Sequence, residues 1–162
     1  MAATYTGGHI GAGIKVAYAV GSPHVWLKFE QVEDVTPPQI TPDKIDTTVH
    51  QVTTRFKSNI PGMEQVSDVI IKMLRNADPV TAPNQNALPG LVQASTTVWL
   101  RIEVPATANP GVDNLYSAYE LTGRFANKKE ITPLMQKVEL ETSFMFDGGS
   151  YAEYNPAASL LP

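Results

Sequence analysis

The sequence predicts a mainly β protein, an antiparallel β-sandwich or barrel with one short α-helix. Three observations lead to this fold class. Apolar and polar residues alternate with a period of two in several segments, as they do in half-buried strands. The 13 prolines lie mostly between those segments, where strands should end. One further segment, residues 84–94, is rich in Ala, Leu and Gln, which favour helix.

The chain is expected to begin with an N-terminal arm over residues 1–24, because its first residues are small and Gly-rich. The glycines of "GGHIGAG" have no strand before them and no Walker lysine after them, so a flexible arm is favoured over a phosphate-binding loop. The first strand is predicted at 25–30, where Val25, Leu27 and Phe29 alternate with polar or amphipathic residues.

A long hairpin is predicted next. The β-branched composition of 47–56 favours a strand, and Pro61-Gly62 predicts the turn of a protruding loop over 57–65. The segment after this loop is ambiguous from its residues alone. Its periodicity slightly favours a helix, whereas its place behind a Pro-Gly turn favours the return strand of the hairpin. The apolar positions that share one helical face are Val66, Val69, Ile70, Met73 and Leu74.

The second half of the chain is read as one helix followed by strands. Asn84 is the expected N-cap of the helix at 84–94, although Pro89-Gly90 lies where the helix interior should be. Alternating patterns or strand-favouring composition then predict strands at 98–104, 117–126 and 136–146. The central domain therefore covers 25–146, and the Gly-Gly pair after it is expected to begin a C-terminal tail over 147–162.

Composition limits the function. A chain of 162 residues is one domain by size, and the absence of cysteine excludes disulfides and thiolate metal sites. The net charge of −4 argues against a surface that holds DNA tightly. No basic segment with an apolar core opens the chain and no apolar stretch is long enough to span a bilayer, so we expect a soluble protein without a membrane partner.

No catalytic, metal or cofactor site is expected. The three histidines, at positions 9, 24 and 50, are far apart and have no ligand-type spacing, so ordinary surface or strand positions are favoured. Glu139 and Glu141 could form a carboxylate pair on one strand face, but a solvated face is the simpler interpretation. No Ser or Thr has the context of a nucleophile elbow, and the protein is therefore predicted not to be an enzyme.

Several segments together resemble the tail tube (major tail) protein of long, flexible-tailed bacteriophages of the siphophage type. They cover about residues 25–146. The segments are, in order, "DVTPPQITPDKIDTTVH", "RFKSNIPGM", "ADPVTAPNQNALPGLVQAS", "VWLRIEVP" and "ELTGRFANKKEITPLMQKVELETSF". In the last of these, Gly123 and Pro133 lie at the breaks the family has. The resemblance implies a tail-tube-like fold in which the segment at 67–75 is the return strand of the hairpin.

The resemblance also implies a function. Such proteins form stacked hexameric rings around a tape measure protein, and the rings enclose the channel for genome delivery. The expected partners are other copies of the chain, the tape measure protein, and the tail terminator and distal tail or baseplate proteins at the tube ends. DNA is expected to pass through without specific binding. The expected location is the virion tail, with assembly in the host cytoplasm.

Two sets of residues are assigned on this basis. The loop that would contact the adjacent ring contains Lys57, Asn59, Pro61 and Gly62. Side chains on exposed strand faces are candidates for the lumen, where polar and acidic groups repel phosphate. These lumen candidates are Gln51, Thr53, Asp68, Glu120, Glu139 and Glu141.

Alternatives remain open at this point. A tube protein of a type VI-like secretion system shares the architecture, and a monomeric β-sandwich binding module is also compatible with the strands. For the two arms, we predict ordering across subunit boundaries on assembly, and the alternative is that they pack onto their own sandwich.

Overall fold

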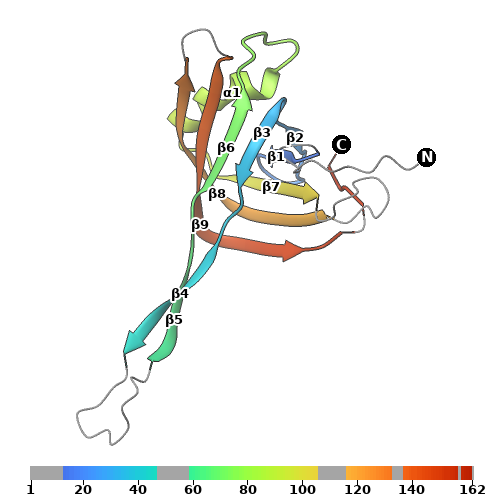
Figure 1. Ribbon diagram of the computed structural model, residues 1–162. Helices are drawn as coiled ribbons and strands as arrows, with labels where there is room; N and C mark the ends of the chain where they lie inside the picture. Colours follow the sequence, from blue (N-terminus) through green and yellow to red (C-terminus); the bar gives the residue numbers. More distant parts are fainter. Residues whose placement is uncertain (1–12, 47–58, 106–115, 133–136, 157, 162) are drawn as a thin grey trace, which may run out of the picture. The chain divides into compact units, whose positions relative to one another are not determined.

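The computed structural model describes residues 13–46, 59–105, 116–132, 137–156 and 158–161. Within them, one seven-stranded sheet has the order β2-β1-β7-β8-β9-β6-β3, and a separate two-stranded ribbon contains β4 and β5. Every strand pair is antiparallel (Figure 1). The strands are β1 (Lys15–Ala19), β2 (Leu27–Lys28), β3 (Val32–Thr36), β4 (Ile40–Asp46), β5 (Asn59–Val66), β6 (Val69–Leu74), β7 (Val98–Pro105), β8 (Tyr116–Ile131) and β9 (Glu139–Tyr154), and the helix is α1 (Pro83–Gln93).

The large sheet curls because β8 and β9, each 16 residues long, belong to both of its halves. The first half of β8 pairs with β7, and the second half pairs with the beginning of β9, which in turn pairs with β6. Register shifts in the β8–β9 pairing lie between Leu121 and Gly123 and between Phe125 and Asn127. Irregularities of this kind bend strands, and they coincide here with the fold of the sheet into a half-barrel.

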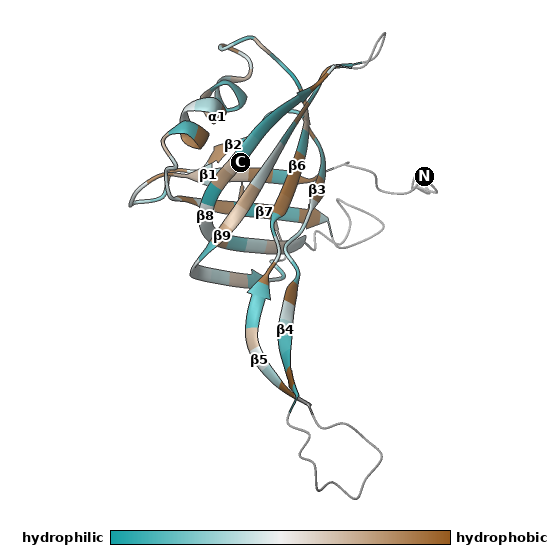
Figure 2. Cartoon of the chain, turned by 90° about the vertical axis from the view of Figure 1, so that its left-hand side faces the viewer, coloured by the Kyte–Doolittle hydropathy of each residue, from teal (hydrophilic) through white to brown (hydrophobic). Residues whose placement is uncertain are grey.

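The hydrophobic core lies on the concave side of this half-barrel and under α1. Alternate residues of the central strands point into it, and Figure 2 shows the hydrophobic stretches of β6 and β7 that provide many of them. Tyr18, Phe29 and Phe125 pack edge to face or tilted against one another, with ring centroids 5.1 to 6.0 Å apart. Leu88 of α1 is fully buried against the same cluster. The predicted mainly β architecture with one short helix is confirmed.

The helix begins one residue earlier than predicted and continues through Pro89-Gly90. Asn84 is not its N-cap, because the capping position belongs to Ala82 and Pro83 occupies the first helical position. The Asn84 side chain instead donates hydrogen bonds to the Lys28 carbonyl oxygen (2.7 Å) and to Glu30 Oε1 (3.0 Å). The helix is thereby attached to the end of β2 and to the segment that follows it.

The strands predicted at 98–104, 117–126, 136–146 and 67–75 are present as β7, β8, β9 and β6. The helical periodicity of the last segment is overridden by its pairing with β3 and β9. The strand predicted at 25–30 is reduced to the two residues of β2. The predicted strand at 47–56 lies outside the described residues.

The arm predictions are wrong for the residues that the structure describes. Residues 15–19, assigned to the N-terminal arm, form β1, whose last four residues are buried. Residues 147–154, assigned to the C-terminal tail, continue β9 past Gly148-Gly149. Leu161 is buried as well, with 4% of its surface exposed. These segments pack onto their own sheet, which was the alternative interpretation.

The two-stranded ribbon belongs to a separate compact unit of residues 38–67. The predicted turn at Pro61-Gly62 is wrong, because both residues lie within β5. Pro42 pairs with Glu64 and Lys44 with Pro61, so two residues of β5, Gly62 and Met63, face Asp43 alone. Pro-Gly therefore marks a β-bulge in this chain, and the connection between β4 and β5 falls on residues outside the described part.

Candidate assembly surfaces

The outer face of the β3-β6-β9-β8 half-sheet carries a row of alternating charges. The register places Asp34 of β3 beside Lys72 of β6, Lys72 beside Glu141 of β9, and Glu141 beside Lys129 of β8. The row therefore crosses four strands in the order minus, plus, minus, plus. Cross-strand pairs of opposite charge stabilise a sheet modestly, by about 0.2–1 kcal/mol each.

Two of the lumen candidates lie on this face. Glu139 and Glu141 alternate with Leu140 and Thr142, which are buried in the core, so both glutamates point outward and are partly exposed. Glu139 Oε1 lies 3.9 Å from Lys137 Nζ, and Lys137 also forms an ion pair with Glu33. The Glu33 carboxylate raises the pKa of Lys137. The structure thus brings these two candidates together, on a face whose charges are mixed rather than purely acidic.

The other lumen candidates are separated from that pair. Asp68 is exposed just before β6. Glu120 lies in the other half-sheet, 3.7 Å from Arg101 Nη1, and accepts a hydrogen bond from the Tyr154 hydroxyl (3.3 Å). Gln51 and Thr53 lie outside the described residues, as does Lys57 of the predicted contact loop.

Glu120 belongs to a polar cluster beneath the C-terminal segment. Arg101 lies over the rings of Trp26 and Tyr154, at 5.6 and 5.5 Å from their centroids. Its Nε is 3.4 Å from Glu103 Oε1, and the Glu103 side chain is completely buried. Burial raises the pKa of the Tyr154 hydroxyl. The cluster is a fixed structural element rather than an open site.

The C-terminal segment is held by that cluster. Glu103 accepts hydrogen bonds from the Ser159 hydroxyl and from the Leu160 N–H (2.9 Å). The Lys15 ammonium group donates to the Leu161 carbonyl oxygen at 3.1 Å. The segment therefore lies against Lys15 of β1 and Glu103 of β7, on the side of these strands opposite the core.

We expect Glu103→Ala to destabilise the fold by about 3 kcal/mol, because it leaves Arg101 buried beside one carboxylate fewer and releases two hydrogen-bond donors. Glu103→Gln, which keeps a side-chain acceptor, should cost less. Urea unfolding of the variants and of wild type measures both effects. Equal stability of all three proteins would contradict this role.

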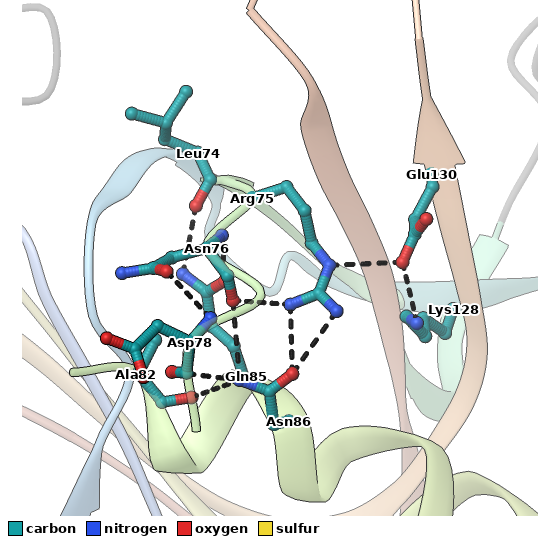
Figure 3. A network of polar contacts seen from close by, with 9 residues as sticks. All are labelled: Leu74, Arg75, Asn76, Asp78, Ala82, Gln85, Asn86, Lys128 and Glu130. Carbon is teal, nitrogen blue, oxygen red and sulfur yellow. Dashed lines mark hydrogen bonds and ion pairs between the residues drawn. The ribbon is translucent and has the colours of Figure 1, made fainter. Parts of the chain in front are cut away.

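A second polar network attaches α1 to the end of β6 and to β8 (Figure 3). The buried Gln85 side chain donates to the carbonyl oxygens of Glu30 (2.7 Å) and Leu74 (3.0 Å) and accepts from the Asn76 N–H (3.0 Å). Arg75 binds Asn86 Oδ1 at 3.2 Å and Glu130 Oε1 at 3.1 Å. Lys128 and Arg75 lower the pKa of Glu130 in the folded protein. The ion pairs of Glu130 therefore stabilise the fold fully above the pKa that Glu130 has in the unfolded chain. This stabilisation is lost as the pH falls through the lower pKa of Glu130 in the folded protein.

The ribbon exposes apolar side chains. No residue of β4 is buried, and Ile45 and Ile60 face each other across the ribbon at 49% and 50% exposure. Met63, in the bulge, is 80% exposed. A two-stranded ribbon alone is marginally stable in water, so apolar side chains on it favour packing against a partner.

Two strands of the charged half-sheet have an unpaired edge. Among the described residues, β3 pairs only with β6, and the second half of β8 pairs only with β9. Unpaired edges offer backbone donors and acceptors to a further strand. Among the described residues no further strand pairs with either edge, and α1 contacts β8.

Neither a candidate metal site nor a membrane-spanning helix is found among the described residues. It contains no group of three or more His, Asp or Glu side chains that could hold a metal ion. His24, the one histidine in that part, packs against Trp99 with ring centroids 4.6 Å apart. None of its helices is long and apolar enough to cross a membrane.

No protein-family model and no curated protein matches the chain. Solved structures do. The anti-feeding prophage baseplate, a six-fold symmetrised cryo-EM structure, superposes with a TM-score of 0.64 and 7% identity, covering 87% of this chain and 91% of that one. The tail of an empty GTA particle with C6 symmetry superposes with a TM-score of 0.63 at 5% sequence identity. The match covers 86% of this chain and 93% of that one.

The SPP1 tail tube, solved by solid-state NMR and cryo-EM, gives a TM-score of 0.60 at 12% identity and covers 88% of this chain and 75% of that one. Identities this low establish a shared fold. The predicted tail-tube-like fold is thereby confirmed.

Asp34, Lys72 and Lys129 were not among the predicted surface residues. The acidic pair at 33–34 and the basic pair at 128–129 are visible in the sequence. Their alignment in one row depends on the register between strands that are far apart in the chain, and no sequence pattern gives that register.

Proposed function

We propose that the chain is a structural, non-enzymatic subunit of a bacteriophage tail tube of the siphophage type. Copies of it form hexameric rings that stack into a tube around a tape measure protein, and the tube conducts the genome into the host. The tail terminator and distal tail or baseplate proteins bind the tube ends. The protein resides in the virion tail after assembly in the host cytoplasm.

The observation that carries this proposal is the half-barrel with its charged outer face between two unpaired edges. A sheet that can be extended on both sides suits a ring of repeated subunits, because head-to-tail contacts close by rotation. The shared fold with six-fold symmetric tail and baseplate assemblies supports the same conclusion. The exposed apolar ribbon β4–β5 supplies a further contact, which we assign to the adjacent ring.

In this ring the outer face of β3-β6-β9-β8 lines the lumen. Glu139 and Glu141 are then lumen residues, and the neighbouring lysines compensate much of their charge. A wall with little net charge neither binds phosphate nor repels it strongly, which suits a channel that DNA must traverse. Glu120 is outside this assignment because it is engaged with Arg101 in the other half-sheet.

Reversal of a lumen charge should make the channel hold DNA. We expect Glu139→Lys tubes to retain short duplex DNA at low salt and to release it as salt is raised, because each added cation releases counterions from the duplex. Co-sedimentation of labelled DNA with assembled tubes measures this. Glu153→Lys, an equal charge change at an exposed position of the other half of β9, is the control. Equal retention by both variants would contradict the lumen assignment.

The proposal is tested by sedimentation velocity and negative-stain microscopy of the purified protein. Rings or tubes with a central channel are expected. A type VI-like tube protein would also form tubes, whereas a monomeric binding module would remain a single species at every concentration. Addition of the tape measure protein of the same tail separates the first two, since tubes whose length follows the tape measure are expected only for the phage tail.

A further inference from the structure

The charge row described above has a property that concerns the contact between subunits in one ring. Its two ends lie on the two unpaired edges of the half-sheet and have opposite signs, Asp34 on β3 and Lys129 on β8. Both side chains are exposed, and within the described residues neither forms an ion pair. Each therefore offers its charge to a neighbour.

We propose that the lateral partner of each edge is a second copy of this chain, placed so that Lys129 of one subunit lies beside Asp34 of the next. This inference rests on the proposed ring. Negative and positive side chains then alternate around the whole ring, and no two like charges are neighbours in the row. The charge row thereby specifies that the β8 edge of one subunit pairs with the β3 edge of the next.

Strand direction agrees with this arrangement. The four strands β3, β6, β9 and β8 alternate in direction, so the two edge strands run opposite ways. In a ring, every copy has the same orientation, and β8 of one copy therefore meets β3 of the next in the antiparallel sense. That is the pairing used throughout the sheet.

The same charges disfavour the competing dimers. A two-fold axis would place β3 against β3 or β8 against β8, and so bring two acidic or two basic edges together. Of the remaining charges on these two strands, the exposed Arg124 adds to the positive charge of β8. Glu33 is paired with Lys137, and Glu130 with Lys128 and Arg75. Head-to-tail contact is thus the arrangement in which the exposed charges attract.

The test uses two single charge reversals, Asp34→Lys and Lys129→Glu, in the full chain. Each variant alone places like charges at every lateral contact, and we expect its ring assembly to weaken by about tenfold per contact at low salt. An equimolar mixture should assemble again, because alternating subunits restore an attractive pair at every contact. Sedimentation velocity and negative-stain microscopy measure assembly, and circular dichroism with thermal unfolding checks that each variant is folded.

The outcomes are distinct. Variants that assemble like wild type overturn the inference, and so does a mixture that stays dissociated although each variant is folded, since the loss then arises within one chain. If wild type itself forms no rings, the proposed function fails and the inference falls with it. If a reversal prevents folding, the neutral variants Asp34→Asn and Lys129→Gln replace it. Both should weaken assembly in a salt-dependent manner, and assembly equal to wild type would overturn the inference.

A fourfold reversal gives an independent check. The variant D34K/K72E/K129E/E141K keeps the alternation within each chain and at contacts between its own copies, so it should form rings alone. In a mixture with wild type, every mixed contact would join like charges. Separate rings of the two proteins are expected, and randomly mixed rings would overturn the inference.

Discussion

Gly123→Ala is expected to abolish the fold or to destabilise it by about 3 kcal/mol or more. An added Cβ at this position would lie 1.9 Å from the Met145 carbonyl oxygen and 2.8 Å from Phe144 Cε1. The first of these atoms is backbone, so β8 and β9 would have to separate at the bend that joins the two half-sheets. Relief by a side-chain rotation is not available.

Gly90→Ala is the matched control for this variant. Gly90 lies in α1, is exposed, and has no atom within 4 Å of an added Cβ. Because Ala favours helix over Gly, this substitution should stabilise the protein by about 0.5–1 kcal/mol. Urea unfolding of both variants measures the contrast. A Gly123→Ala protein with wild-type stability would show that the close approach of β8 and β9 at this point is not required.

The second large effect is expected at the ribbon. The triple variant Ile45→Thr, Ile60→Thr and Met63→Gln replaces the three most exposed large apolar side chains of the ribbon and keeps Ile40. Threonine at both isoleucine positions is compatible with a strand. At about 1 kcal/mol per side chain, the contact of each subunit with the adjacent ring should lose roughly 3 kcal/mol, which is about a hundredfold in the association constant of that contact. Single rings are therefore expected where wild type forms tubes.

Val80→Thr is the control, because Val80 is 83% exposed but precedes α1, far along the chain from the ribbon. It should form tubes like wild type. Thermal unfolding should be unchanged in both proteins, since the substituted side chains are not buried. Normal tubes from the triple variant would contradict the assignment of the ribbon to the contact between rings.

The elements that were predicted well are those with one buried and one exposed face. β7 and the first part of β9 show the alternation that such strands require, and α1 has good helix formers. β1 was missed for the opposite reason. Its residues from Val16 to Ala19 are all buried, so no alternation of buried and exposed positions remains.

The glycine-containing bulges were the other source of error. Pro61-Gly62 and Gly148-Gly149 have the composition of turns, but both lie inside strands. At the second site, the Asp147 carboxylate accepts hydrogen bonds from the Gly149 N–H and from the Thr122 hydroxyl, and these bonds maintain the strand through the irregularity. Such support comes from a neighbouring strand and is invisible in a local sequence pattern.

Of the candidate surface residues, the glutamates at 139 and 141 were placed correctly on one exposed face because the period of two is strict there. The environment of Glu120 could not be predicted, since its partners Arg101 and Tyr154 come from two other strands. The charge row across the half-sheet could not be predicted for the same reason, because it depends on the register between strands that are far apart in the chain.

A cryo-EM reconstruction of the assembled wild-type protein would show directly which face of the sheet lines the channel. We expect six-fold symmetric rings stacked into a tube, with the β3-β6-β9-β8 face and its glutamates 139 and 141 toward the channel. A protein that stays monomeric at all concentrations, or a tube in which this face points outward to solvent, would contradict this expectation.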